Sequence, residues 1–324
     1  MPRSLTSPRP GPIVAVGGAN VDLTCRADEA IQLATSNPGT IHRSFGGVAR
    51  NVAMNLARLG VPTTLFSAVG TDEAGAALVA DCERAGIDCS LVLRLEAATG
   101  AYVAVLDADG ELVVGIAAME VIGALTPERI AAQQERLAAA ALIFADANLA
   151  GPTLAALAGI AARHAVPLVL DPVSTRKAPR LAAVLDAGVP IFALTPNRDE
   201  LAVLSGEDTT TTAGLERACA GFRARGVRNL IVGLGSAGAF LASAAGHEFL
   251  AGQAGKVHDV TGAGDAAVAA ALWALRAGRD LQAAARAGQV AAALTIACAD
   301  AVSGELSAEA LMGALADDGE RGEQ

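Results

Sequence analysis

The stretch DVTGAGDAA, residues 259–267, joins a glycine-rich loop to the start of an alanine-rich segment. Backbone N–H groups in such a loop, at the positive end of a helix, favour a bound phosphate. Yet the stretch ends in a carboxylate, Asp265, which an anion site would ordinarily repel. A carboxylate is useful there where it accepts the proton of a hydroxyl that attacks a phosphoryl group. By itself, the loop is also typical of a glycine-rich turn that caps a helix.

Outside this loop, short apolar runs alternate with long alanine-rich segments. Runs such as IVAVGGA (13–19), TTLFSAVG (63–70) and ALIFADA (141–147) predict strands, and VARNVAMNLARLG (48–60) predicts a helix that Gly60 ends. Strands that are apolar without alternation are typical of a parallel sheet covered on both faces. We therefore expect an α/β fold with a doubly wound, mostly parallel sheet and helices on both faces.

One region departs from this alternation. Residues 99–116, TGAYVAVLDADGELVVGI, contain two strand-like runs around Asp-Ala-Asp-Gly, which predicts a hairpin. With the polar, irregular segment 22–45 it predicts a small β lid, built from about 22–45 and 99–118, over the substrate side of the sheet. The whole chain, 1–324, is expected to be one domain, with frayed ends at 1–12 and 317–324.

Composition excludes several classes of function. The chain has 324 residues, 52% of them hydrophobic, and a net charge of -10, which argues against nucleic acid or an anionic membrane surface as a partner. The five cysteines form no CxxC motif and the four histidines are isolated, which argues against zinc and for reduced thiols. The polar N-terminus is typical neither of a signal peptide nor of a membrane span. We expect a cytoplasmic protein.

Several ordered motifs together resemble a known family. GAGD after DVT, and FGGVARNVAMNLARLG (45–60), resemble the two signatures of the ribokinase-like (PfkB) carbohydrate and nucleoside kinases. Four further stretches stand in the same order along the chain as in the family: VGGANVD, SAVGTDEAG, TPNRDE and VGLGSAG. The resemblance therefore covers nearly the whole chain. It implies a kinase that uses ATP and Mg²⁺. A dinucleotide site is disfavoured because VGGAN leads into no GxGxxG spacing.

The resemblance also implies roles for individual residues. Asp265 would be the base, and the N–H groups of Gly262, Ala263 and Gly264 the anion hole. The hydroxyls of a ribose-like substrate would be held by Asn20, Asp22, Gly46, Gly47 and Asn51. The nucleotide side would consist of Asn197, Gly233, Gly235, Ser236, Gly238, Thr261 and Gln289. Glu200 would hold Mg²⁺ through water, while Asp259 and Thr261 match positions that bind K⁺ in many members. Without the resemblance, NRDE is more typical of a helix start capped by Asn197.

Three further stretches, TSNPG (35–39), ADAN (145–148) and DPVSTRK (171–177), resemble the branch of this family that phosphorylates pseudouridine. They imply that Ser36 and Asn37 face the uracil ring, that Asn148 lies on the substrate side and that Lys177 approaches phosphate. The alternatives are a structural turn at SNPG and a surface lysine. GIAAME (115–120) departs from the branch, because Ala118 stands where an Asp or Asn is expected, which puts base recognition in doubt.

The sequence thus predicts ATP-dependent 5′-phosphorylation of pseudouridine. It also predicts a homodimer formed through the lid, because the hairpin strands present open edges. Two alternatives remain open at this point. One is another kinase of the same family, acting on ribose, adenosine or another nucleoside. The other is a non-catalytic protein that binds a nucleoside, although such a protein would have no need of the base.

Overall fold

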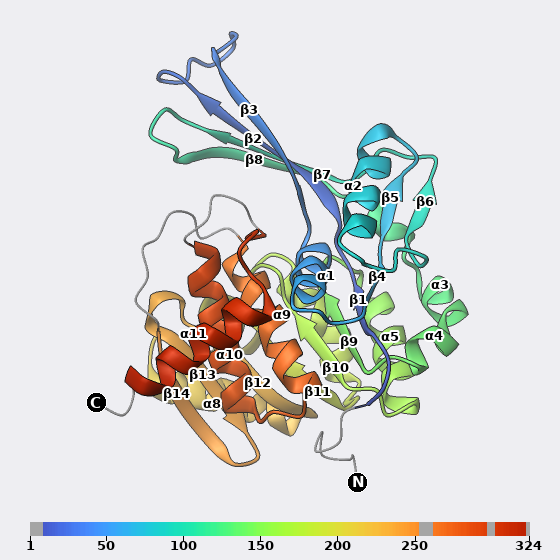
Figure 1. Ribbon diagram of the computed structural model, residues 1–324, viewed down its shortest axis with the longest axis vertical. Helices are drawn as coiled ribbons and strands as arrows, with labels where there is room; N and C mark the ends of the chain where they lie inside the picture. The colour runs from blue at the N-terminus through green and yellow to red at the C-terminus, as the bar shows by residue number, and fades with distance from the viewer. Residues whose placement is uncertain (1–8, 253–261, 297–301, 322–324) are drawn as a thin grey trace.

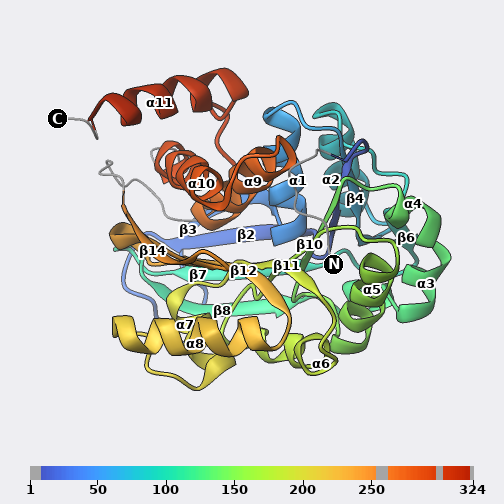
Figure 2. The same cartoon turned by 90° about the horizontal axis from the view of Figure 1, so that it is seen from below.

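An eight-stranded sheet runs through the middle of the molecule (Figures 1 and 2). The computed structural model describes residues 9–252, 262–296 and 302–321. Neighbouring strands are parallel from β4 to β12, and β13 and β14 add an antiparallel edge. In spatial order the strands are β14 (Gly246–Ala251), β13 (Gly238–Ser243), β12 (Val227–Gly233), β11 (Ile191–Leu194), β10 (Leu168–Asp171), β9 (Leu142–Asp146), β1 (Ile13–Val16) and β4 (Thr63–Phe66).

Helices cover both faces of this sheet, as Figure 2 shows. One face carries α1 (Val48–Arg58), α2 (Glu73–Arg84), α9 (Ala263–Arg276), α10 (Leu281–Ile296) and α11 (Ala308–Arg321). The other carries α3 (Pro127–Ala132), α4 (Gln134–Ala138), α5 (Gly151–Arg163), α6 (Ala182–Asp186), α7 (Arg198–Ser205) and α8 (Thr212–Ala224). Short 3-10 turns are η1 (Glu120–Ala124), η2 (Ala178–Leu181) and η3 (Gly235–Ala237). The predicted α/β class, with helices on both faces, is confirmed.

The sequence of β9 explains this layering. All five residues are buried, and successive side chains enter opposite cores. Phe144 packs with α1 and α9 on one face, whereas Ile143 packs with α5 on the other. A central strand with two buried faces has no position for an exposed polar side chain, which is why the run is apolar without alternation. Its last residue, Asp146, is the exception and belongs to the site described below.

A second sheet of four strands projects from the main body (Figure 1). Its strands are, in spatial order, β3 (Gly39–Gly46), β2 (Asn20–Ala27), β7 (Ala101–Leu106) and β8 (Leu112–Ala118). The hairpin turn between β7 and β8 is held by the Asp107 carboxylate, which accepts hydrogen bonds from the N–H groups of Asp109 and Glu111. We call this four-stranded sheet the lid sheet.

Local structure differs from the sequence prediction in three places. Residues 63–70 are two strands, because Ser67 interrupts the run and donates to the Gly17 carbonyl at 2.6 Å. After it, β5 (Ala68–Gly70) leaves the main sheet and pairs with β6 (Leu93–Leu95). The segment 22–45 is less irregular than predicted, since eight-residue strands flank its loop. The antiparallel β13–β14 hairpin has no counterpart in the prediction.

Described residues near both chain ends form contacts or helix. Arg9 donates hydrogen bonds to the carbonyls of His164, Ala165 and Ala138, which fixes the chain just before β1. At the other end, the backbone of α11 continues to Arg321. No helix in the described part of the chain is long and apolar enough to cross a membrane.

Candidate active site

A cavity of about 740 Å³ opens at the carboxyl ends of β10, β11 and β12, beneath the first turn of α9. Ligands of open α/β sheets bind at this edge because the loops that follow the strands meet there. The cavity brings together most of the residues predicted for the nucleotide and the transferred group. They are Asn197, Glu200, Gly233, Gly235, Ser236, Gly238, Ala263, Gly264, Asp265 and Gln289.

The far wall of the cavity is apolar and is built mainly by α9 and α10. It consists of Ile231, Val268, Ala271, Ala285, Gly288, Ala292, Ala293 and Ile296. Most of these side chains are small, and we call this part of the cavity the apolar slot. Gln289 lines the same cavity, and its amide NH₂ donates to the Leu250 carbonyl at 3.2 Å. Apolar walls with a few polar groups are typical of small-molecule sites.

The first turn of α9 lies at the centre of the site. Gly262 caps this helix in the left-handed conformation, with φ of 77°, which glycine adopts without strain. The first N–H groups of a helix lack partners within it, so those of Ala263 and Gly264 are available to an anion. Asp265 stands in the same turn. The preceding residues, 253–261, lie outside the described residues, and so do the predicted ligands Asp259 and Thr261.

Asp265 is in a position to act as a base. Its carboxylate accepts a hydrogen bond from the Asn51 amide NH₂ at 2.8 Å. Burial raises the pKa of Asp265 from 3.8 to about 7; the Asn51 hydrogen bond opposes this rise, and the carboxylates of Asp146 and Asp22 add to it. A carboxylate with a pKa near neutrality accepts a proton better than an ordinary one and is still about half ionised near pH 7.

On the lid side, glycines allow polar groups to approach one another closely. Asn20 donates to the Asp22 carboxylate at 2.6 Å, and both lie on β2 next to the end of β3. A Cβ on Gly46 would lie 1.9 Å from an Asp22 carboxylate oxygen. Gly47, with φ of 95°, would bring a Cβ to 2.4 Å from the Gly18 carbonyl oxygen. Position 47 therefore requires glycine, whereas a side chain at position 46 would displace the Asp22 carboxylate.

Asp146 organises this side of the site, although sequence reasoning assigned it no role. Its fully buried carboxylate accepts hydrogen bonds from the N–H groups of Gly18, Ala49 and Asn148, at 2.8 to 2.9 Å. It thereby joins the loop after β1, the start of α1 and the loop after β9. Burial raises the pKa of Asp146, and the three N–H groups oppose the rise. The signal available in the sequence was an acid at the end of an apolar strand.

Asn148 and Lys177 contact each other beside Asp146. The Lys177 ammonium donates to the Asn148 amide oxygen at 2.6 Å. Burial lowers the pKa of Lys177, the Asp146 carboxylate raises it and Arg180 lowers it. Lys177 does not line the cavity that holds the predicted nucleotide residues. The structure therefore places Lys177 next to Asn148, the residue predicted for the substrate side.

Ser36 and Asn37 lie far from Asp265. They are exposed in the loop between β2 and β3, and the register pairs Asn20 with Gly46 near the body and Ala27 with Gly39 at the far end. Strands of that length extend about 20 Å at 3.3 Å per residue. The Asn37 amide closes its own loop, donating to the Gln32 carbonyl and accepting from the Gln32 N–H. These contacts hold Asn37 within its own loop.

A group of carboxylates lines the cavity near the first turn of α9. Asp171, Glu200 and Asp265 line the same cavity. Burial raises the pKa of Asp171 well above its usual range, and the carboxylates of Glu200 and Asp265 contribute to this rise. Asp171 accepts from the Thr195 hydroxyl and from the N–H of Val173. Glu200 accepts from the Asn197 N–H at 2.9 Å in a reciprocal capping box.

The donor chemistry of these carboxylates fits Mg²⁺, which prefers hard oxygen ligands and usually retains several waters. Among the described residues, no three Asp, Glu, His or Cys side chains are placed to hold a metal ion together. The arrangement therefore suits an ion held mostly through water and phosphate oxygens. Asp171 was not among the predicted site residues.

The comparisons with known proteins agree with this geometry. The sequence profile of the pfkB family carbohydrate kinases matches residues 12–308. A pseudouridine kinase of Escherichia coli strain K12 is 35% identical over 266 residues, covering 81% of this chain and 83% of the relative. An uncharacterized sugar kinase of the same strain is 32% identical over 298 residues, or 91% of this chain and 81% of the relative.

Solved structures share the fold as well. The ribokinase of Arabidopsis thaliana complexed with ribose and ATP aligns with a TM-score of 0.83 and 25% identity, covering 94% of this chain and 98% of that one. The predicted resemblance is confirmed over nearly the full length. This chain belongs to the pfkB family of carbohydrate kinases.

Proposed function

We propose that the chain transfers the γ-phosphoryl group of ATP to the 5′-hydroxyl of pseudouridine, with Asp265 as the base. The observation that carries this proposal is the position of the Asp265 carboxylate. It is buried in the first turn of α9, lies beside the free N–H groups of that turn, and accepts a hydrogen bond from Asn51. A base for the hydroxyl and donors for the phosphoryl charge are thus adjacent.

The residues on the two sides of Asp265 would bind different reactants. Asn20, Asp22 and Asn51 would bind the substrate hydroxyls, because buried amides and carboxylates supply directional donors and acceptors. Gly46 and Gly47 would let the ribose approach the backbone. On the other side, the glycine-rich turn 233–238 and Asn197 would hold the phosphates of ATP, with the adenine in the apolar slot near Gln289. Mg²⁺ near Glu200 would neutralise phosphate charge, and K⁺ near Asp259 and Thr261 remains a proposal outside the described residues.

The choice of pseudouridine is supported by the E. coli pseudouridine kinase, whose identity of 35% is spread over four-fifths of both chains. It is also supported by the paired Asn148 and Lys177, which place an amide and an ammonium next to the substrate side. Such groups suit the carbonyls and N–H groups of a uracil ring. Ser36 and Asn37 support it less, since reaching the base from the lid tip requires the lid sheet to close or a second copy to contribute.

We further propose that the chain is a single kinase domain that dimerises through the lid sheet. Large apolar side chains are exposed on this sheet and its loop, namely Leu33, Ile41, Leu112, Val113, Val114 and Ile116. Exposed apolar strands at open sheet edges favour contact with another chain. Covering them would also exclude water from the site, so that ATP is not hydrolysed.

A second candidate substrate class is sugars such as ribose, because the relatives include an E. coli sugar kinase and a ribokinase complexed with ribose. The residues around Asp265 would serve ribose or another nucleoside equally well, because they hold only hydroxyls. A protein that merely binds a nucleoside is less favoured, because binding alone gives no reason to bury a carboxylate at a helix N-terminus.

The test is ADP formation by the purified protein with Mg-ATP and, separately, pseudouridine, uridine, adenosine, inosine and ribose at matched concentrations. A marked preference for pseudouridine, with a 5′-monophosphate as product, is expected. Preference for another compound would replace the substrate and keep the mechanism. Binding of a nucleoside without turnover of any of the five would overturn the assignment as a kinase of these substrates.

A further inference from the structure

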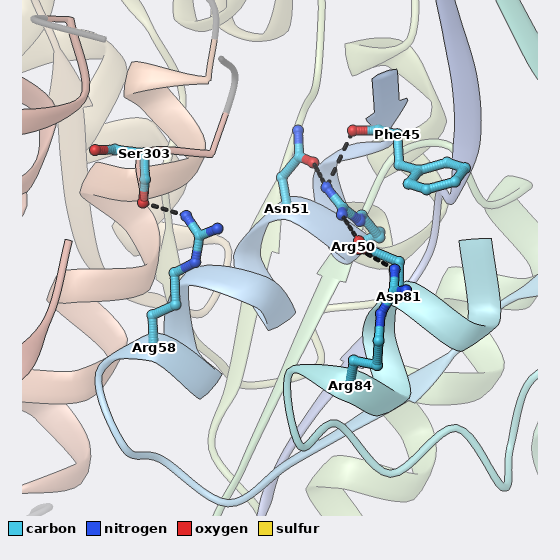
Figure 3. Close-up of polar contacts among 7 residues, drawn as sticks. All are labelled: Phe45, Arg50, Asn51, Arg58, Asp81, Arg84 and Ser303. Carbon is cyan, nitrogen blue, oxygen red and sulfur yellow. Dashed lines mark hydrogen bonds and ion pairs between the residues drawn. The ribbon is translucent and has the colours of Figure 1, made fainter. Parts of the chain in front are cut away.

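A buried arginine lies directly behind the residue that contacts Asp265. Arg50 follows Ala49 in the first turn of α1, and only 6% of its side chain is exposed. Its Nη1 donates to the Asn51 amide oxygen at 3.1 Å and to the Phe45 carbonyl at 3.0 Å. Its Nη2 donates to the Asp81 carboxylate on α2 at 2.5 Å. Figure 3 shows Arg50 between Asn51 and Asp81.

These contacts determine which end of the Asn51 amide faces the site. A carboxamide has one accepting end and one donating end. Because Arg50 can only donate, it occupies the oxygen of Asn51 and leaves the NH₂ group for Asp265, which accepts it at 2.8 Å. A rotated amide would place NH₂ against the guanidinium and an oxygen against the carboxylate. Both contacts would then be repulsive.

We propose that Arg50, anchored by Asp81, is a positioning residue for phosphoryl transfer: it fixes the Asn51 amide and thereby the Asp265 carboxylate. Asp81 contacts Arg50, Arg50 contacts Asn51, and Asn51 contacts Asp265, so Arg50 and Asp81 act through Asn51. This inference rests on the proposed kinase function and adds two residues to its machinery. Arg50 also links the same amide to the lid sheet, since Phe45 is the penultimate residue of β3.

A purely structural role for Arg50 would be to join α1 to α2. Two other arginines provide controls for that role. Arg84 contacts the other oxygen of Asp81 at 3.1 Å, and its side chain is 74% exposed. Arg58, at the opposite end of α1, donates to the Ser303 carbonyl, away from the site (Figure 3). Losing either arginine would disturb helix contacts without moving the Asn51 amide.

The charges around Asp265 determine how its titration should respond. Asp22 from β2, Asp146 at the end of β9 and Asp171 at the end of β10 are acids that interact with it, and Arg50 lowers the pKa of Asp22. Losing Arg50 would weaken the Asn51 hydrogen bond, which raises the pKa of Asp265. It would also make Asp22 less ionised, which lowers it. The first effect should dominate, because the Asn51 bond acts on Asp265 more strongly than Asp22 does.

The experiment compares wild type with Arg50→Met, Arg50→Lys, Asp81→Asn, Arg84→Gln and Arg58→Gln. Steady-state kinetics with the preferred hydroxyl substrate give kcat, both KM values and the pH profile. Arg50→Met is expected to lower kcat about 10- to 100-fold, the effect of a misplaced reacting group, with the KM for ATP changed by less than about twofold. The acidic limb of the profile should move to higher pH. The kcat values of Asp81→Asn and Arg50→Lys should lie between those of Arg50→Met and wild type. The kcat values of Arg84→Gln and Arg58→Gln should match wild type.

A double-mutant cycle with Asn51→Ala separates positioning from general damage. If Arg50 acts through Asn51, the Arg50→Met change adds little to the loss that Asn51→Ala already causes. If the fold-losses in kcat of the two single variants instead multiply in the double variant, the inference is overturned. So would kcat values for Arg50→Met equal to those of Arg84→Gln, or a lower melting temperature with kcat and pH profile intact. If Arg50→Met does not fold, Asp81→Asn and Arg50→Lys decide in its place, and wild-type kinetics in both would overturn the proposal.

Failure of the proposed function has a different signature. In that case wild type itself transfers no phosphoryl group to any hydroxyl substrate, and this inference falls with it. If wild type is active and the Arg50 and Asp81 variants equal it, only the positioning role is refuted.

Discussion

The pKa of Asp265 predicts how activity should depend on pH. With a pKa of about 7, about a tenth of the carboxylate is ionised at pH 6 and about nine-tenths at pH 8. Because the base acts only when ionised, kcat/KM for the hydroxyl substrate should rise about tenfold between these values and then level off. An ordinary aspartate would give a profile that is flat above about pH 5.

The variant Asn51→Ala tests whether this acidic limb, the rise of kcat/KM with pH, reports the ionisation of Asp265. A hydrogen bond to a charged group is worth about 1.5 to 3 kcal/mol, or about 1 to 2 pH units. Removing the Asn51 bond should raise the pKa of Asp265 and move the limb upward by that amount. At pH 7, lost ionisation alone would lower kcat/KM about 5- to 50-fold, and the deficit should shrink toward pH 9.

The assay is initial-rate ADP formation from pH 5.5 to 9.5 at saturating Mg-ATP. Titration of ATP itself is the same for wild type and Asn51→Ala, so it cannot produce a difference between their limbs. An unmoved or downward-shifted limb in Asn51→Ala would refute the assignment of the limb to Asp265. A wild-type profile that is flat from pH 5.5 upward would refute the raised pKa.

Three further predictions follow from single contacts. Asp265→Asn should stabilise the protein at pH 8, by up to about 4 kcal/mol in chemical denaturation. An acid whose pKa is raised in the folded state destabilises the fold increasingly as pH rises from 3.8 to about 7. The gain in unfolding free energy of Asp265→Asn should therefore vanish near pH 4. An equal gain at pH 4 and pH 8 would contradict the raised pKa as its cause. Gly46→Ala should raise KM for the hydroxyl substrate about tenfold or more, since its Cβ would collide with Asp22; an unchanged KM would show that Asp22 is not needed there. Glu200→Gln should keep the capping box but raise the Mg²⁺ requirement about tenfold in a magnesium titration; an unaltered titration would remove Glu200 from the metal site.

The sequence was most informative where a local motif has a local cause. The glycines at 47 and 262 are required by close approach or left-handed backbone, so their pattern predicted the loops around the site. The apolar runs likewise predicted the parallel sheet, because central strands are buried on both faces. The ordered motifs extended these local signals to a family, which the comparisons confirmed.

What the sequence did not reveal depends on contacts between distant segments. The partners of Asp146 include backbone N–H groups 97 and 128 residues away, and no spacing rule connects them. The ion pair of Arg50 with Asp81 likewise spans 31 residues and two helices. The placement of Ser36 and Asn37 depends on the length of the β2–β3 hairpin, which the polar composition of 22–45 concealed.

The measurement that tests the central claim most directly is kcat of Asp265→Ala with the preferred hydroxyl substrate, at pH 8 and with ATP and substrate saturating. Loss of a general base predicts a fall of about 10²- to 10⁴-fold. Calorimetric binding of ATP should be retained, because Asp265 is proposed to contact the hydroxyl and not the adenine. A variant that keeps the full wild-type rate would contradict the account, since no other residue is proposed to accept the proton.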